Sequence, residues 1–147
     1  MDLTATVTEL KTIWQDDYFT ICLDEDDRMM FYKIHGYPRS SDQIRQGHDE
    51  LYRIAREMHR KCTIRYLIAD LTDAKILLIS DIRFIGTVSY PRLAKTGIRK
   101  LAILLKDDFH VKMNVQKTLT CMKSNVFQQV KLYPSVEPAL AWFRMYP

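Results

Sequence analysis

Short runs of β-branched and aromatic residues dominate the first third of the chain, and they predict strands. Residues 8–14 form a short first strand in this interpretation, and residues 17–23 and 28–36 form a longer pair. The acidic segment DEDD lies between the two longer runs and is typical of a polar turn. We therefore expect the pair to form an antiparallel hairpin, which ends at the Gly-Tyr-Pro sequence of residues 36–38.

The hydrophobic period then changes from that of a strand to that of a helix. Apolar positions recur every three or four residues after residue 40 and predict a helix that ends near Lys61. Its apolar stripe consists of Ile44, His48, Leu51, Ile54, Ala55 and Met58. Ser40, Ser41 or Asp42 can accept hydrogen bonds from the first-turn amides as the N-cap of this helix.

A nearly continuous apolar run at residues 62–71 predicts a strand that is covered on both faces. A second helical stretch opens at Ser80 and Asp81. Pro91 lacks a backbone N–H, so we expect a kink or a break there. Gly97 is suited to end this stretch because glycine adopts the left-handed conformation without a steric penalty.

The remaining residues repeat the pattern of a strand followed by a helix. Residues 98–105 predict a central strand, which is followed by a helix that Asp107 or Asp108 caps. Residues 125–133 predict another strand, and a closing helix follows Ser135. Strands that are separated by helices need crossover connections. The predicted fold class is therefore α/β, with a single mixed sheet, an N-terminal antiparallel hairpin and then alternating helices and strands.

The composition agrees with one domain over residues 1–147. The chain is 47% hydrophobic and 27% charged, and this length is sufficient for a substantial core. No apolar run approaches the roughly 20 residues of a membrane-spanning helix, and the first residues lack the features of a secretion signal. We therefore expect a cytoplasmic protein with no membrane partner. Three cysteines without a C-x-x-C pair agree with a reducing compartment.

Charge is distributed unevenly along the chain. Residues 1–50 contain 11 acidic and 5 basic residues, whereas residues 51–147 contain 7 acidic and 17 basic residues, so their net charges are −6 and +10. This asymmetry can steer acidic partners, although solvated helix faces explain it equally simply. Acidic residues are interleaved with the basic ones and no nucleic-acid-binding motif is present, so nucleic acid is the least favoured partner.

Motifs of catalysis and of cofactor binding are missing from the sequence. It contains no glycine-rich phosphate loop, no H-E-x-x-H and no G-x-S-x-G, so we expect neither an enzyme nor a bound cofactor. His48 and His59 share a helix face but lie about 16 Å apart, which is too far for one metal ion, and no metal site is expected. Asp70 and Asp73 are either paired catalytic carboxylates or, more simply, residues of a strand end and a turn. Asp70 is expected at the carboxyl end of its strand, where α/β sheets bind ligands.

Ser80 is the residue with the most specific chemistry in the sequence. If it caps the second helix, a phosphate on its hydroxyl would lie beside free backbone amides and the positive end of the helix dipole. Arg83 could pair with that phosphate, whereas Asp81 would oppose it. The simpler interpretation is an ordinary N-cap.

The stretch RYLIADLTDAKILLIS, followed by a helix and then TGIRKLAILL, resembles the STAS (anti-sigma-factor antagonist) family, especially its short stand-alone members. The similarity extends from about Asp17 to Phe143. In signalling members of that family, a partner kinase phosphorylates a serine at the start of the second helix, ten residues after the aspartate of the strand. Counting from Asp70, the corresponding residue here is Ser80. The family motif Asp-Ser-Ser-Gly is replaced by Leu-Ile-Ser-Asp at residues 78–81.

The resemblance implies a non-enzymatic bacterial regulatory module with a degenerate phospho-switch, whose protein partner is an anti-sigma-like kinase or phosphatase. The residues expected at the contact are Asp70, Ser80, Asp81, Arg83 and Phe84. The alternative hypothesis is a carrier of a small molecule or lipid with the same fold. The residues expected to line its pocket are Phe84, Tyr90, Met113 and Trp142. The exposed edge of the hairpin could also pair two copies of the chain as a homodimer.

Overall fold

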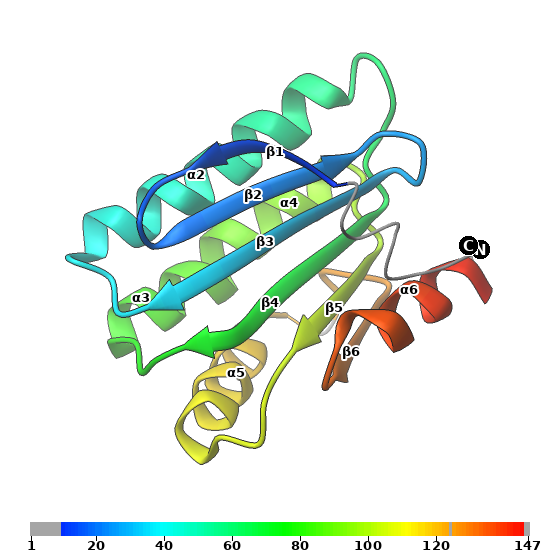
Figure 1. The fold of residues 1–147 in the computed structure, drawn as a ribbon. Coiled ribbons are helices and arrows are strands. Elements are labelled where there is room, and N and C mark those ends of the chain that lie inside the picture. Colours follow the sequence, from blue (N-terminus) through cyan, green and yellow to red (C-terminus); the bar gives the residue numbers. More distant parts are fainter. Residues whose placement is uncertain (1–9, 124, 146–147) are drawn as a thin grey trace.

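The computed structural model describes residues 10–123 and 125–145, which form a six-stranded mixed sheet covered by helices (Figure 1). The strands lie side by side in the order in which they occur in the sequence. Neighbouring strands are antiparallel from β1 to β3 and parallel from β3 to β6, so the predicted fold class is confirmed. The strands are β1 (Lys11–Gln15), β2 (Phe19–Asp24), β3 (Met29–Gly36), β4 (Tyr66–Ala74), β5 (Lys100–Leu104) and β6 (Gln129–Tyr133).

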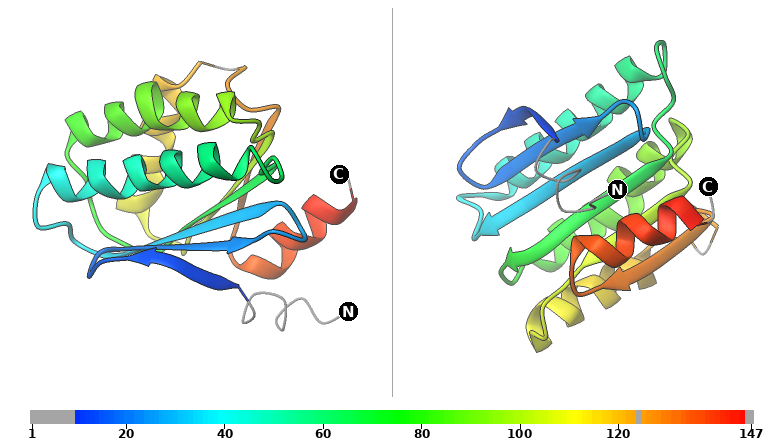
Figure 2. Two further views of the ribbon diagram at one scale, coloured as in Figure 1. Left: turned by 90° about the horizontal axis from the view of Figure 1, so that it is seen from above. Right: turned by 45° about the vertical axis from the view of Figure 1, so that its right-hand side comes forward.

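Within the described part of the chain, α2, the α3–η1–α4 segment and α5 cover one face of the sheet, and α6 covers the other (Figure 2). The first three connect parallel strands that are added in one direction, so right-handed crossovers place them all on the same face. None of the described helices is long and apolar enough to cross a lipid bilayer. The helices are α2 (Ser41–Met58), α3 (Ile79–Phe84), η1 (Ile85–Ser89), α4 (Tyr90–Lys95), α5 (Phe109–Cys121) and α6 (Val136–Met145).

β4 differs from its prediction at both ends. It begins at Tyr66 and continues to Ala74, because β3 passes a bulge after Lys33 and pairs with it as far as Gly36. Asp70 is therefore inside the strand and not at its carboxyl end. It lies opposite Leu104, the last residue of β5, so the ladder on that side stops at Asp70.

The last strand is shorter than the sequence pattern suggests, and the first strand continues one residue further than predicted, to Gln15. Residues 125–128 are irregular, and β6 begins only at Gln129, so the expected alternation from residue 125 is wrong. Phe127 is buried in this irregular segment and attaches it to the core. Residues 8 and 9 of the predicted first strand lie outside the described residues.

The helix continues through Pro91, so the expected break does not occur, and the irregularity is a π turn directly before the proline. The segment from α3 to α4 runs through one wide π turn, in which the amide of Tyr90 donates to the carbonyl of Ile85. A proline ring needs room at the preceding turn and supplies no hydrogen bond, and a π turn accommodates both conditions. Gly97 follows the helix with a φ of +117°, in the left-handed region, as expected from its sequence position.

The core has a large part beneath α2–α5 and a smaller part beneath α6. All six residues of the apolar stripe predicted for α2 are buried. Gly47 lets α2 approach the sheet closely, since a Cβ atom there would lie 2.5 Å from the ring of Phe19. Asp108 caps α5 by accepting hydrogen bonds from the amides of His110 and Val111, as one of the two sequence alternatives predicts.

Candidate functional site

The carboxyl ends of β3, β4 and β5 lie at one edge of the sheet because these strands are parallel (Figure 1). The loop of residues 37–40 follows β3, residues 75–78 follow β4, and residues 105–108 follow β5. Open α/β sheets bind ligands and partners beyond this edge. We refer to these three loops, with the first turns of the helices that follow them, as the rim.

Large apolar side chains are exposed at the rim. Among the described residues, eight large hydrophobic side chains are exposed, and five of them belong to the rim. These five, which we call the apolar rim, are Tyr37, Ile76, Leu78, Ile79 and Phe109. The exposed fractions of Tyr37, Leu78 and Phe109 are 69%, 66% and 71%. A concentration of exposed apolar residues at one edge is typical of an interaction surface.

An ion network lies beside the apolar rim. Lys33 Nζ lies 3.2 Å from a carboxylate oxygen of Asp73 and 3.9 Å from one of Asp70, and Lys106 Nζ lies 3.6 Å from the other oxygen of Asp73. The hydrogen bond and charge of Lys33, followed by the charge of Lys106, lower the pKa of Asp73. Asp70 also accepts hydrogen bonds from the amide and hydroxyl of Thr72, at 3.0 and 2.6 Å. The two carboxylates share the cation of Lys33, so the geometry favours a structural network over acid–base chemistry.

Ser80 is not the N-cap of its helix. Leu78 occupies that position, and Ser80 lies exposed in the first turn of α3. The prediction was wrong because the helix begins two residues earlier than the polar pair Ser80 and Asp81 suggests, directly after the loop that follows β4. Ser80 is therefore accessible, but its hydroxyl does not cap the helix.

Asp81 points into the protein and connects two helices. Its side chain is only 2% exposed, and one carboxylate oxygen accepts a hydrogen bond of 3.0 Å from the hydroxyl of Ser41. Burial, followed by the charge of Asp81, raises the pKa of Tyr18. Asp81 thus attaches α3 to the first turn of α2, and its charge is directed away from solvent.

The other two residues expected at the contact lie on the same helix but in different environments. Arg83 is exposed, whereas Phe84 is half-buried beneath the guanidinium group of Arg45, whose Cζ atom lies 4.5 Å from the ring centre. Phe84 is therefore covered and offers little surface to a partner. Ser80 and Arg83 are the accessible members of the predicted contact.

The four residues expected to line a carrier pocket do not share a cavity. Tyr90 is buried and its hydroxyl contacts that of Tyr32 at 2.6 Å. Met113 lies in a groove of about 360 Å³ between α3 and α5, which also contains Arg83. Trp142 belongs to α6 and is buried against the opposite face of the sheet. The predicted pocket is wrong because sequence distance does not indicate which face a helix covers.

A buried group of aromatic and polar residues lies between α2, the η1–α4 segment and the sheet. We call His48, Ser89, Tyr32, Tyr90 and Phe19 the buried centre. His48 Nδ1 lies 2.6 Å from the Ser89 hydroxyl, and the rings of Phe19 and Tyr32 stack with their centres 5.0 Å apart. Burial, followed by the charge of Arg92, lowers the pKa of His48 to about 3. His48 is thus neutral at physiological pH and contributes to packing.

An apolar run in the sequence indicates part of the apolar rim, although it matches no catalytic or binding motif. Residues 76–79 read Ile-Leu-Leu-Ile inside a segment expected to be a loop, and apolar residues are uncommon in exposed loops. Tyr37 and Phe109 gave no comparable signal, because a single aromatic residue beside a turn is equally compatible with burial. Among the described residues, no group of three or more potential ligands is placed to hold a metal ion.

The fold and the rim together define an α/β protein with a mixed six-stranded sheet and an exposed apolar edge. Comparison with models of known protein families and with curated proteins finds no match to this chain.

Proposed function

We propose that the chain is a non-enzymatic regulatory module that binds a protein partner through the apolar rim. The observation that carries this proposal is the exposure of five large apolar side chains on three neighbouring loops. Removing such side chains from water favours association by about 25 cal/mol for each Å² of apolar surface buried. Tyrosine is also among the residues that contribute most at protein interfaces.

The charges around the apolar rim favour an acidic partner. Arg39 and Lys106 are exposed on the rim in ion pairs with Asp17 and Asp73. Lys75 and Arg83 are exposed without an ion pair among the described residues, against one such carboxylate on the rim, Asp42, so a small positive excess remains. Complementary charges steer a partner and determine its orientation more than they increase affinity. An acidic segment with several apolar side chains would match both features of this edge.

The strand and helix order agrees with what the resemblance to the STAS family implies, and it supports a related mode of regulation. Ser80 is exposed and follows directly after Leu78 and Ile79 in the sequence. A phosphate on Ser80 would introduce two negative charges beside apolar side chains and weaken binding of an acidic partner. Asp81, whose carboxylate points inward, opposes such a phosphate less than the sequence suggests.

The apolar rim is tested by crosslinking in cells that express the protein. A photoreactive phenylalanine analogue replaces Leu78 in one variant and Met145 in a matched control, since these two side chains are 66% and 67% exposed. We expect one discrete protein crosslinked from position 78 and none from position 145. The purified partner should then bind the Leu78→Ser variant about tenfold more weakly or worse. Equal crosslinking from both positions would contradict the proposal, and a crosslinked second copy of the chain would identify a homodimer as the partner.

Regulation at Ser80 is tested on the same purified pair. Ser80→Asp should weaken partner binding several-fold while Ser80→Ala leaves it unchanged, because only the former adds charge at the rim. Ser135→Asp is the matched control, since Ser135 is exposed on the loop before α6. If Ser80→Asp and the unmodified chain bind the partner with the same affinity, a phospho-switch at Ser80 is contradicted.

A further inference from the structure

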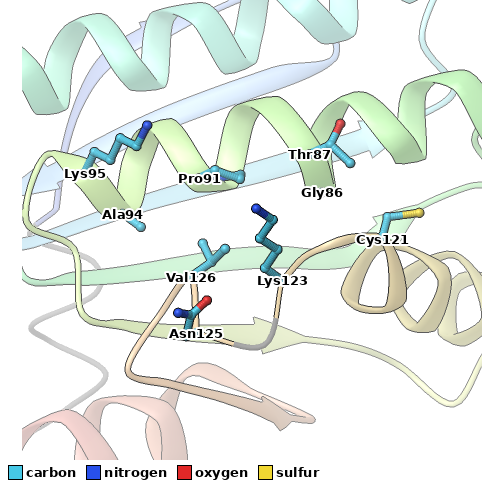
Figure 3. Close-up of a pocket in the computed structure, with 9 residues that line it drawn as sticks. All are labelled: Gly86, Thr87, Pro91, Ala94, Lys95, Cys121, Lys123, Asn125 and Val126. Atoms are coloured by element: carbon cyan, nitrogen blue, oxygen red, sulfur yellow. The ribbon is translucent and has the colours of Figure 1, made fainter.

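A cavity of about 440 Å³ lies away from the rim, on the outer side of the η1–α4 segment (Figure 3). One wall is the helix surface from Gly86 to Lys95, and the other is formed by Cys121, Lys123, Asn125 and Val126. Small-molecule sites in proteins have volumes of about 300–1,000 Å³, so this cavity is large enough for one.

The cavity exists because two segments approach each other closely at one end and then diverge. A Cβ atom at Gly86 would lie 2.6 Å from the carbonyl oxygen of Thr118, so only glycine allows α5 to pack there. The chain leaves α5 after Cys121 and crosses below the helix, where Pro91 and Ala94 present little side-chain volume (Figure 3). The neighbouring turn is the π turn of η1, and π turns are frequent at functional sites.

The lining combines an apolar surface with positive charge. Pro91, Ala94 and Val126 provide apolar contacts, and Val126 also packs against the core. Lys123 extends from the lower segment toward the helix, and Lys95 lies at the end of the cavity (Figure 3). No carboxylate is present among the nine lining residues, and neither lysine forms an ion pair within the described residues.

Two neutral polar groups complete the lining. Thr87 uses its hydroxyl proton in a hydrogen bond of 2.6 Å to the carbonyl of Arg83, so its oxygen remains able to accept. Asn125 is exposed at the edge of the cavity and offers an amide that can donate to an oxygen anion. The donors therefore outnumber the acceptors, which favours an anionic ligand over a cationic one.

We infer that this cavity binds a small amphipathic anion, either an organic phosphate or an organic carboxylate. The anionic group contacts Lys123, and Lys95 and Asn125 also line the cavity. The apolar body of the ligand lies against Pro91, Ala94 and Val126. This site is independent of the apolar rim, so it adds a small-molecule input to a module whose partner binds elsewhere.

The experiment records amide chemical shifts of the full-length protein during titration with four probes. Phenyl phosphate and 3-phenylpropionate carry both a charge and an apolar body, inorganic phosphate carries charge alone, and benzyl alcohol carries the apolar body alone. We expect saturable shifts at residues 86–95 and 121–126 with at least one of the two amphipathic anions. Inorganic phosphate and benzyl alcohol should each bind about tenfold more weakly or worse, because each lacks one half of the contact.

Two charge-removing variants connect the shifts to the cavity. Lys123→Met should weaken binding of the amphipathic anion about tenfold, whereas Lys61→Met, at an exposed lysine beyond the end of α2, should leave it unchanged. Leu78→Ser should also bind the probe normally, which separates this site from the rim.

Three results would overturn the inference. The first is the absence of saturable shifts with both amphipathic anions. The second is an equal loss of affinity in Lys123→Met and Lys61→Met. The third is binding of inorganic phosphate as tight as that of phenyl phosphate, since the apolar wall would then contribute nothing.

Discussion

The buried centre and the apolar rim depart in opposite directions from the usual placement of polar and apolar residues. In the buried centre, the imidazole of His48 has no exposed surface, although histidine is normally at least partly solvated. At the rim, Phe109 exposes 71% of its surface to solvent, although phenylalanine is normally buried. Both regions are built on the same six-stranded sheet.

The two regions differ in whether the folded chain supplies polar groups with hydrogen-bond partners and apolar side chains with apolar contacts. His48 Nδ1 has the Ser89 hydroxyl as its hydrogen-bond partner, and Tyr32 has Tyr90, so folding compensates part of the cost of their burial. The second ring nitrogen of His48, Nε2, is buried without a hydrogen-bond partner among the described residues. The side chain of Leu78 is 66% exposed, and the folded chain leaves it largely without apolar contacts. Stability should therefore depend on the buried centre, and binding should depend on the rim.

The largest expected effect is the loss of stability when an aromatic ring of the buried centre is removed. Phe19→Ala should reduce the free energy of unfolding by about 3–5 kcal/mol, because the ring is fully buried against Tyr32 and Gly47. Leu78→Ala at the rim should change it by no more than about 0.5 kcal/mol. Urea denaturation of both variants measures the two values. Similar losses would show that the rim is part of the core after all.

A smaller effect is expected from acid, through His48. Burial lowers the pKa of His48 from 6.5 to about 3, so the unfolded chain takes up a proton that the folded chain does not. Stability is therefore lost as the pH falls from about 6.5 toward about 3, and the loss between about pH 6 and pH 4 should be about 2–3 kcal/mol.

The control for this prediction is His48→Asn, which keeps a hydrogen-bonding atom near Nδ1 and cannot titrate. Urea denaturation at several pH values should show a flatter profile for this variant than for the unmodified chain. Parallel profiles would mean that folding does not lower the pKa of His48.

The smallest of these effects concerns the hydroxyl pair of Tyr32 and Tyr90. Either single change to phenylalanine leaves the other hydroxyl buried without its partner and should cost about 1–2 kcal/mol. The double variant should lose less than the sum of the two, since neither hydroxyl then remains unpaired. Thermal and urea unfolding of the unmodified chain, the two single variants and the double variant measure this double-mutant cycle. Strict additivity would argue that the 2.6 Å contact contributes no stability.

The elements of the fold were predictable because their signals are local. The apolar stripe of α2 predicted the buried face residue by residue, and Asp108 was correctly among the alternatives for the cap of α5. The boundaries were less predictable, since the end of β4 depends on how far β3 continues beside it. The π turn at Pro91 was also missed, because the packing of Gly86 against α5 contributes to the local geometry.

The candidate site was predicted only in part. The sequence indicated the edge of the sheet and the exposed residues Ser80 and Arg83, but it expected Asp81 at the partner contact and grouped Trp142 with Tyr90. Both errors concern the direction of a side chain relative to segments that are distant in the sequence. The ion network of Lys33, Asp73 and Lys106 was missed for the same reason, since it joins two strands and a loop.

The sequence by itself determined the order of strands and helices, the antiparallel start of the sheet and the buried face of α2. These properties follow from hydrophobic periods of two and 3.6 residues, which act over a few neighbouring residues. Only the tertiary structure decided that α6 covers the face opposite to α2, that Asp81 turns inward to Ser41, and that a cavity opens beside Gly86. Each of these depends on which distant surfaces fill the remaining space, and packing in three dimensions has no short-range signature in the chain.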